Sequence, residues 1–178
     1  MSEKLMYLDI LETAERQYKL SIALNLQAGY TCGIEKKNLF DYNINSIYGK
    51  YGLTENELFL TPEHEKIATS TLLHCSTYII CLQIDRYTEK FVPNRFSHGD
   101  MDLRNACLIA RILRNAFAHD PLNPIWEIRM PEAKSKLLSV KDIITVDTTN
   151  LDGQRVKRSH YGWPHAILKM SEYIRQTV

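Results

Sequence analysis

Apolar positions recur at three- and four-residue steps along much of the chain and predict several helices. The clearest pattern covers residues 101–119, where one side of a helix would carry Leu103, Ala106, Cys107, Ala110, Leu113 and Phe117. The same spacing predicts a first helix over residues 2–27, which Gly29 and Gly33 would end, and a shorter helix over residues 37–50. A last helix should follow Pro164, with an inner side of Ala166, Ile167, Met170, Tyr173 and Ile174.

A long central helix is predicted to begin at Thr61-Pro62-Glu63 and to last to about Tyr87. This start offers an N-cap hydroxyl, a proline at the first position and an acid in the first turn. Residues 67–84 contain no Asp, Glu, Lys or Arg. That length is marginal for a bilayer, and His74, Gln83 and several hydroxyl side chains dilute the apolar character. We interpret the segment as the buried central helix of a bundle and expect no membrane partner.

The pattern changes after Pro121, where short runs of alternating residues predict strands. Residues 125–128 read as one strand, and residues 142–149 and 154–158 read as a hairpin around a turn at 150–153. The expected fold class is mainly α: a helical bundle with a small C-terminal β-hairpin and a terminal helix. We expect a single domain over 1–178, with the bundle at 1–120, the β appendage at 121–160 and a helix at 161–178 that packs back on the bundle.

Composition and charge narrow the function classes. The chain has 178 residues, a 44% hydrophobic content and a net charge of +1, so a nucleic-acid site would have to be a local patch. The N-terminus lacks a continuous apolar region of the signal-peptide type. No CxxC pair occurs among the cysteines, which indicates a reducing, cytoplasmic setting: Cys32, Cys75, Cys81 and Cys107.

The helix predicted at 101–119 has a polar face as well as its core stripe. Arg104, Arg111, Asn115 and His119 lie at offsets of 0, 7, 11 and 15 and share this face. Arg114 lies about 140° around the helix from His119. The two side chains meet at one ligand only if the helix loosens after Phe117 or if a second chain completes the site. A histidine at a helix C-terminus and solvated arginines also have a purely structural interpretation.

Residues 114–119, Arg114-Asn115-Ala116-Phe117-Ala118-His119, resemble the Arg-Asn-x-x-x-His motif of the HEPN superfamily, the higher eukaryotes and prokaryotes nucleotide-binding domains. These domains are helical bundles, and many are dimeric, metal-independent endoribonucleases of toxin–antitoxin, CRISPR-associated and other defence systems. Other members only bind RNA or nucleotides, and that alternative stays open, as does a protein-interaction module. Pro121 stands where some toxin members carry a tyrosine.

The resemblance implies roles for three residues and a set of partners. His119 would move a proton at the RNA 2′-hydroxyl or the leaving oxygen, and Arg114 would stabilise charge on the phosphate. Asn115 would orient the imidazole or bind phosphate. The expected partners are RNA, a second copy of the chain, and an antitoxin or defence protein, with no cofactor.

Other basic residues are candidates for substrate binding. Arg104 and Arg111 follow the polar face, whereas Arg155, Lys157 and Arg158 form a short basic segment that either tracks phosphates or protects an edge strand. Tyr161 and Trp163 would stack on bases or pack the hairpin onto the bundle. The histidine and acid pairs in the chain match no zinc spacing, so we expect no metal site: His160 with His165, and His98 with Asp100.

Overall fold

The computed structural model describes residues 2–30, 43–46, 49–52 and 61–178. Within them the helices are α1 (Glu3–Tyr30), α2 (Pro62–Phe91), α3 (Met101–Ala118) and α4 (Pro164–Thr177), with a short 3₁₀ helix, η2 (Arg158–His160). The strands are β1 (Asn43–Ser46), β2 (Gly49–Gly52), β3 (Leu137–Val140) and β4 (Ile144–Asp147). The expected class, mainly α with a C-terminal hairpin and a terminal helix, is confirmed.

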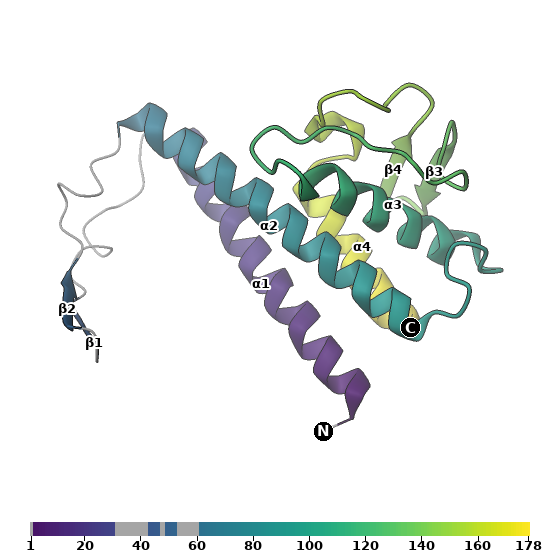
Figure 1. Cartoon of the computed structure of the whole chain (residues 1–178), viewed down its shortest axis with the longest axis horizontal. Helices are drawn as coiled ribbons and strands as arrows, with labels where there is room; N and C mark the ends of the chain where they lie inside the picture. The colour runs from purple at the N-terminus through teal and green to yellow at the C-terminus, as the bar shows by residue number, and fades with distance from the viewer. Residues whose placement is uncertain (1, 31–42, 47–48, 53–60) are drawn as a thin grey trace.

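Helices α1 and α2 form a long antiparallel pair, and one end of this pair extends beyond the rest of the bundle (Figure 1). Helix α2 begins where the sequence predicts, because the Thr61 hydroxyl accepts a hydrogen bond from the His64 backbone N–H at 3.2 Å. It ends at Phe91, four residues later than expected. Helices α1, α3 and α4 all pack against it, so α2 is the central helix of the bundle.

The apolar stretch of α2 meets the requirements of a membrane span by length and composition alone, and α2 is the one helix in the described ranges that does so. In its most apolar window, 39% of the residues are buried inside the chain. Ile80, Cys81 and Ile84 are among them and face the core. The buried side of α2 therefore serves the bundle, while apolar side chains remain exposed on its other side, such as Ile67 and Leu72.

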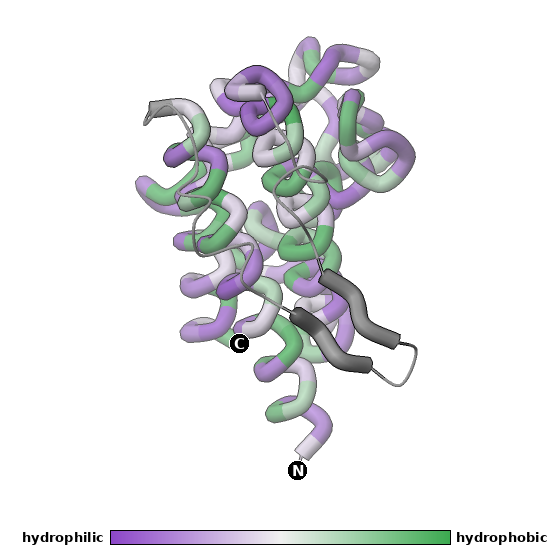
Figure 2. Tube along the Cα trace, turned by 90° about the vertical axis from the view of Figure 1, so that its left-hand side faces the viewer, coloured by the Kyte–Doolittle hydropathy of each residue, from purple (hydrophilic) through white to green (hydrophobic). Residues whose placement is uncertain are grey.

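Helix α3 is enclosed on most sides, because α2 and α4 cover one part of it and the β3–β4 hairpin covers another. The Asn105 side-chain amide donates to the Ser139 carbonyl at 2.8 Å and connects the helix to β3. Along the helices, individual turns carry both hydrophobic and hydrophilic residues (Figure 2). The core stripe predicted for α3 and the inner side predicted for α4 are both buried.

In the first half of the chain, the predicted helix over residues 37–50 and the predicted end of the first helix are wrong. Residues 43–46 and 49–52 form antiparallel strands rather than part of a helix, and residues 37–42 and 47–48 of that predicted helix lie outside the described part of the chain. Asn43, Asn45, Gly49 and Gly52 all disfavour helix, which accounts for the difference. Helix α1 continues through Gly29 to Tyr30, and Gly33 is not described.

The C-terminal hairpin exists, but its predicted pairing is wrong. Strand β4 pairs with β3, which precedes it, in the register Leu138↔Val146, and not with residues 154–158. Both strands alternate buried and more exposed residues, so each contributes an apolar side to the core. The predicted strand at 125–128 has no full partner: Ile125 forms an isolated bridge with Arg155, and the Trp126 N–H donates to the Gln154 carbonyl at 2.9 Å.

A buried carboxylate connects α2 to α3. Asp85 is 2% exposed, and its Oδ1 accepts from the Arg95 guanidinium at 2.9 Å while its Oδ2 accepts from Arg111 Nη1 at 2.6 Å. Arg95 is also buried and donates to the Thr88 hydroxyl at 3.2 Å. The two arginines thus satisfy one internal acid, which makes this cluster a structural element of the bundle.

Replacing Asp85 by alanine is expected to lower the free energy of unfolding by about 3–5 kcal/mol, because it leaves the buried Arg95 charge without its main partner. Equilibrium urea unfolding followed by circular dichroism measures this change. The matched control is Glu172→Ala, which removes the exposed pair with Lys19 (3.8 Å) and should cost less than about 1 kcal/mol. Equal effects of the two substitutions would contradict the structural role of the Asp85 cluster.

Candidate functional site

Helix α3 stays regular up to the end of the motif. Asp100 caps its start by accepting from the Leu103 N–H at 3.1 Å, and the helix runs to Ala118. His119 still has helical dihedral angles (φ −88°, ψ −41°), and the chain turns only at Asp120, whose Oδ1 accepts from the Leu122 N–H at 2.9 Å. The first of the two conditions under which Arg114 and His119 could meet, a loosening of the helix after Phe117, is not met, because Pro121 restricts only the residue before it. Within one chain, Arg114 and His119 therefore stay on different sides of α3.

The Arg114 side chain is half-buried beside Asn115. Its Nη1 donates to the Asn115 Oδ1 at 3.2 Å, and its Nε is buried without a hydrogen-bond partner. Across the described ranges, no carboxylate pairs with this guanidinium. Arg114 thus has no ion-pair partner in the part of the chain that the structure describes, and Asn115 holds its guanidinium in position.

His119 is the exposed member of the motif, with 71% of its side chain accessible. Its Nε2 lies 3.7 Å from Glu127 Oε2, and the same carboxylate oxygen accepts from Arg129 at 2.7 Å. Glu127 was not among the predicted site residues. The alternation of residues 125–128 could have indicated Glu127, since Trp126 and Ile128 face inward and the residue between them faces outward.

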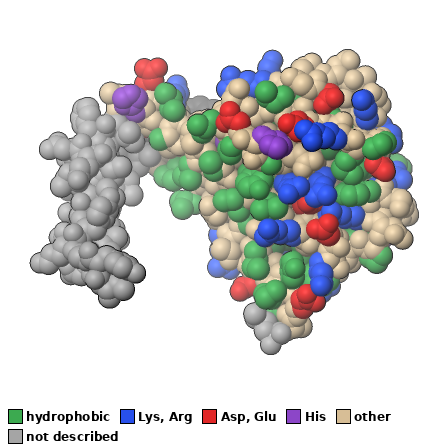
Figure 3. Space-filling view, in the orientation of Figure 1, with side chains coloured by type: hydrophobic (Ala, Val, Ile, Leu, Met, Phe, Trp, Pro, Cys, Tyr) green, Lys and Arg blue, Asp and Glu red, His purple; other side chains and the backbone are tan. Residues whose placement is uncertain are grey.

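The remaining arginines of the α3 polar face have different surroundings. Arg111 forms an ion pair with the buried Asp85, so its guanidinium already has an acidic partner inside the bundle. Arg104 is half-buried near the other end of the helix, about two turns before Arg111. On the face of the molecule seen in Figure 3, Lys and Arg side chains gather over α2 and α3, mixed with acids and bordered by hydrophobic side chains.

The basic segment after the hairpin lies elsewhere, against α1. Arg158 Nη2 donates to the Asn25 Oδ1 at 2.9 Å, whereas Arg155 and Lys157 are exposed. Tyr161 is buried, and burial raises the pKa of its hydroxyl well above the usual value, so this ring packs within the fold. Trp163 is 57% exposed. Of the two aromatic candidates for base stacking, only Trp163 is accessible.

A cavity of about 840 Å³ opens next to the end of α3. Its lining residues come from the C-terminal part of α1, the first half of α2, the loop after α3 and the segment around η2. We call it the η2 cleft, and its described lining residues are Asn25, Leu26, Gly29, Glu63, Lys66, Ile67, Ser70, Thr71, His74, Leu122, Arg155, Arg158 and Trp163. A neighbouring cavity of about 370 Å³ shares Asn25, Leu26, Arg158 and Trp163 with it.

His74 connects this cleft to the motif helix. Its ring contacts Phe117 edge-on, with ring centroids 5.7 Å apart. Burial lowers the pKa of His74, and the positive charges of Arg158 and Arg155 lower it further, while a hydrogen bond to the Pro121 backbone opposes them. Burial and the two guanidinium charges therefore both favour the neutral form of the His74 imidazole.

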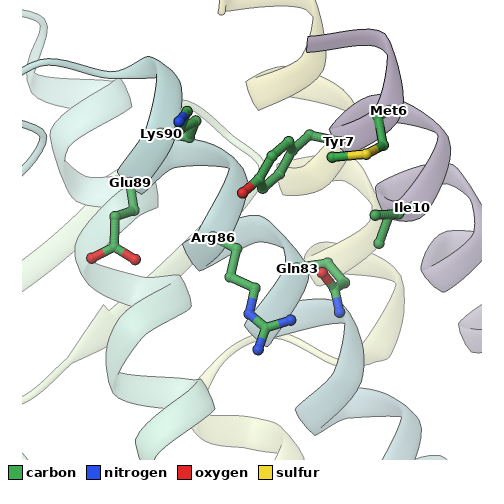
Figure 4. A pocket seen from close by; sticks show the side chains of 7 residues that line it. All are labelled: Met6, Tyr7, Ile10, Gln83, Arg86, Glu89 and Lys90. Atoms are coloured by element: carbon green, nitrogen blue, oxygen red, sulfur yellow. The ribbon is translucent and has the colours of Figure 1, made fainter. Parts of the chain in front are cut away.

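A separate cavity of about 420 Å³ lies between α1 and α2 near the start of α1 (Figure 4). It is lined by Met6, Tyr7, Ile10, Gln83, Arg86, Glu89 and Lys90. In Figure 4 the Tyr7 ring lies between the two helices and the Arg86 guanidinium points away from it. Lys90 is paired with Glu3 at 2.8 Å. No motif residue contributes to this cavity.

Within the described ranges, no group of three or more His, Cys, Asp or Glu side chains is arranged to hold a metal ion. Two of the histidines weighed as ligands already accept hydrogen bonds through Nδ1. His160 accepts from the Trp126 indole N–H at 2.9 Å, and His98 accepts from the Asp100 backbone N–H at 3.1 Å. These contacts give both histidines a structural role.

No protein-family model matches the chain, and no curated protein or solved structure matches it significantly. Function is therefore inferred from the residues at the end of α3 and in the η2 cleft.

Proposed function

We propose that this protein is a metal-independent endoribonuclease of the HEPN type, which acts in a defence or toxin–antitoxin setting and cleaves RNA by attack of a 2′-hydroxyl. The observation that carries the proposal is the contrast between Arg111 and Arg114. Arg111 is ion-paired with the buried Asp85, whereas Arg114 has no acidic partner in the described residues. An arginine kept half-buried and uncompensated beside Asn115 is suited to an anionic ligand such as a phosphate.

The chemistry follows from the side chains. RNA carries a 2′-hydroxyl next to each scissile phosphate. The exposed His119 imidazole accepts the proton of this hydroxyl or gives a proton to the leaving 5′-oxygen, while the phosphorus–oxygen bond to that oxygen breaks. Arg114 offers a planar fork of donors to the charge that builds up on the phosphate oxygens. Asn115 fixes the orientation of that fork.

The regular geometry of α3 supports a composite site in a homodimer. His119 and Arg114 lie on different sides of a helix that remains continuous up to Ala118, so one chain does not bring both to one phosphate. A two-fold axis near the end of α3 would pair Arg114 of one protomer with His119 of the other. The proposed active form is therefore a homodimer with two equivalent sites.

The function is tested with a 5′-labelled single-stranded RNA incubated with the protein in excess EDTA. We expect cleavage, products ending in 2′,3′-cyclic phosphate, and no cleavage at a nucleotide whose 2′-hydroxyl is replaced by hydrogen. The matched control is the same oligonucleotide with the 2′-deoxy substitution one position away from the cleaved bond. Cleavage that requires added Mg²⁺, or products with 5′-phosphate ends, would contradict the proposal.

A second candidate is a non-catalytic module that binds RNA or nucleotides, or a protein partner. The η2 cleft favours it, because Lys66, Arg155 and Arg158 line this cleft and no motif residue does. Binding of RNA without cleavage in the same assay would select this alternative.

A further inference from the structure

Trp163, the residue that precedes α4, combines an unusual backbone conformation with an exposed ring. It has φ 75° and ψ 161°, and it stands between Gly162 and Pro164, the first residue of α4. A positive φ is unfavourable for a bulky side chain, and such strain is commonly found where a residue serves a ligand. The ring is nevertheless 57% exposed at the rim of the η2 cleft. A stacking surface accounts for an aromatic side chain at this place.

The charges of the η2 cleft are unbalanced. Its described lining carries three cations, Lys66, Arg155 and Arg158, against one acid, Glu63. Arg158 is held against α1 by Asn25, so its guanidinium has a fixed position without a carboxylate partner in the described residues. Arg155 and Arg158 line this cleft together with Lys66, so the three positive charges share one cavity. A chain of net charge +1 thus concentrates positive charge here.

The η2 cleft also has the size of a small-ligand site and lies close to the end of α3. About 840 Å³ lies within the range of small-ligand sites and exceeds what one nucleotide needs. Leu122 lines the cleft and follows His119 by three residues, so their Cα atoms lie within about 11 Å of each other. A strand held in the cleft would reach the end of α3 within a few nucleotides.

We infer that the η2 cleft binds one nucleotide of single-stranded RNA, with the base stacked on Trp163 and the phosphate held by Lys66, Arg155 and Arg158. Stacking on an aromatic ring beside a cationic groove is the usual way in which proteins hold single strands. The inference rests on the proposed function for the choice of RNA as the ligand. It gives the substrate a second contact, remote from the motif, that would position the scissile phosphate.

The experiment measures binding in the His119→Ala background, so that the RNA stays intact. A six-nucleotide single-stranded RNA is titrated while tryptophan fluorescence is recorded. The chain has two tryptophans, and Trp126 is fully buried, so quenching reports on Trp163. We expect quenching, and we expect Trp163→Ala to weaken binding about 5- to 150-fold by fluorescence anisotropy of labelled RNA. Trp163→Phe keeps an aromatic face and should retain most of the affinity.

Charge is tested in parallel. Arg155→Gln should weaken binding and reduce the slope of log affinity against log salt by about one. The matched control is Lys134→Ala, which removes an exposed positive charge that lines none of the described cavities. Affinities of Trp163→Ala and Arg155→Gln equal to that of Lys134→Ala would overturn the inference. Adenosine and uridine monophosphates are tested as free nucleotides, and binding of either as tight as the RNA would also overturn the assignment to an RNA strand.

The outcomes separate this inference from the proposed function. If the wild type does not cleave RNA but the Trp163 and Arg155 variants lose RNA binding, the cleft assignment holds and the nuclease proposal fails. If the wild type cleaves RNA and these variants bind normally, the nuclease proposal holds and the cleft assignment fails.

Discussion

Replacing His119 by alanine is expected to slow RNA cleavage by about 10²–10⁴-fold, since the proton carrier is removed while the phosphate-binding groups remain. The substitution should leave the fold intact. His119 is 71% exposed, and within the described residues its ion-pair contact is the 3.7 Å approach to Glu127, a carboxylate that Arg129 already satisfies. The measurement is single-turnover cleavage of labelled RNA in EDTA, with enzyme in excess.

The matched control is His64→Ala. His64 is also an exposed histidine, but it lies in the first turn of α2, where its backbone N–H donates to the Thr61 hydroxyl. This variant should cleave like the wild type, and thermal unfolding should show both alanine variants folded. Equal rates for wild type and His119→Ala would remove His119 from the mechanism.

The elements that could be predicted from sequence are those with local signals. The start of α2 is encoded in three adjacent residues, and the Thr61 cap forms as expected. The stripe from Leu103 to Phe117 fixes both the extent of α3 and the side that it buries. Helix α4 follows in the same way from its own periodicity.

The pairing of the hairpin could not be predicted, because the strand at 144–147 has two neighbouring segments in the sequence with which it could pair. Residues 154–158 and residues 137–140 both flank the 142–149 run, and the favourable turn residues at 150–153 pointed to the wrong one. The actual turn uses Lys141 at φ 44°, a residue type that gives no turn signal. Burial of Leu138 and Val140 against the bundle then decides the pairing, which is a tertiary effect.

For the candidate site, too, the features that depend on local sequence could be predicted and those that depend on tertiary packing could not. The site's position on α3, on a side away from the core stripe, follows from helical periodicity, although His119 is the one exposed residue of that polar face. The pairing of Arg111 with Asp85 could not be predicted from this periodicity. Asp85 precedes Arg111 by 26 residues and reaches it only through the packing of α2 on α3. The η2 cleft takes residues from four separate segments, so no short sequence pattern reveals it.

Replacing Arg114 by alanine should slow cleavage by about 10²–10³-fold, because a preorganised donor to the developing charge is lost. Arg114→Lys should recover only part of this loss, since an ammonium group lacks the planar fork that Asn115 holds in place. The same single-turnover assay measures both. A full recovery with lysine would show that Arg114 supplies charge alone, without directional hydrogen bonds.

Mixing the two inactive variants tests how the site is assembled. If Arg114 of one protomer acts with His119 of the other, a dimer of one Arg114→Ala chain and one His119→Ala chain contains one site with both native residues. Random exchange makes about half of the dimers mixed, so about one quarter of the wild-type sites should return. As a control, Arg114→Ala mixed with the double variant Arg114→Ala/His119→Ala contains no intact site and should stay inactive. Light scattering and exchange of labelled subunits establish that mixed dimers form. If they form and activity does not return, the two residues do not act across the dimer, and the continuous α3 helix would then have to open within one chain to bring them together.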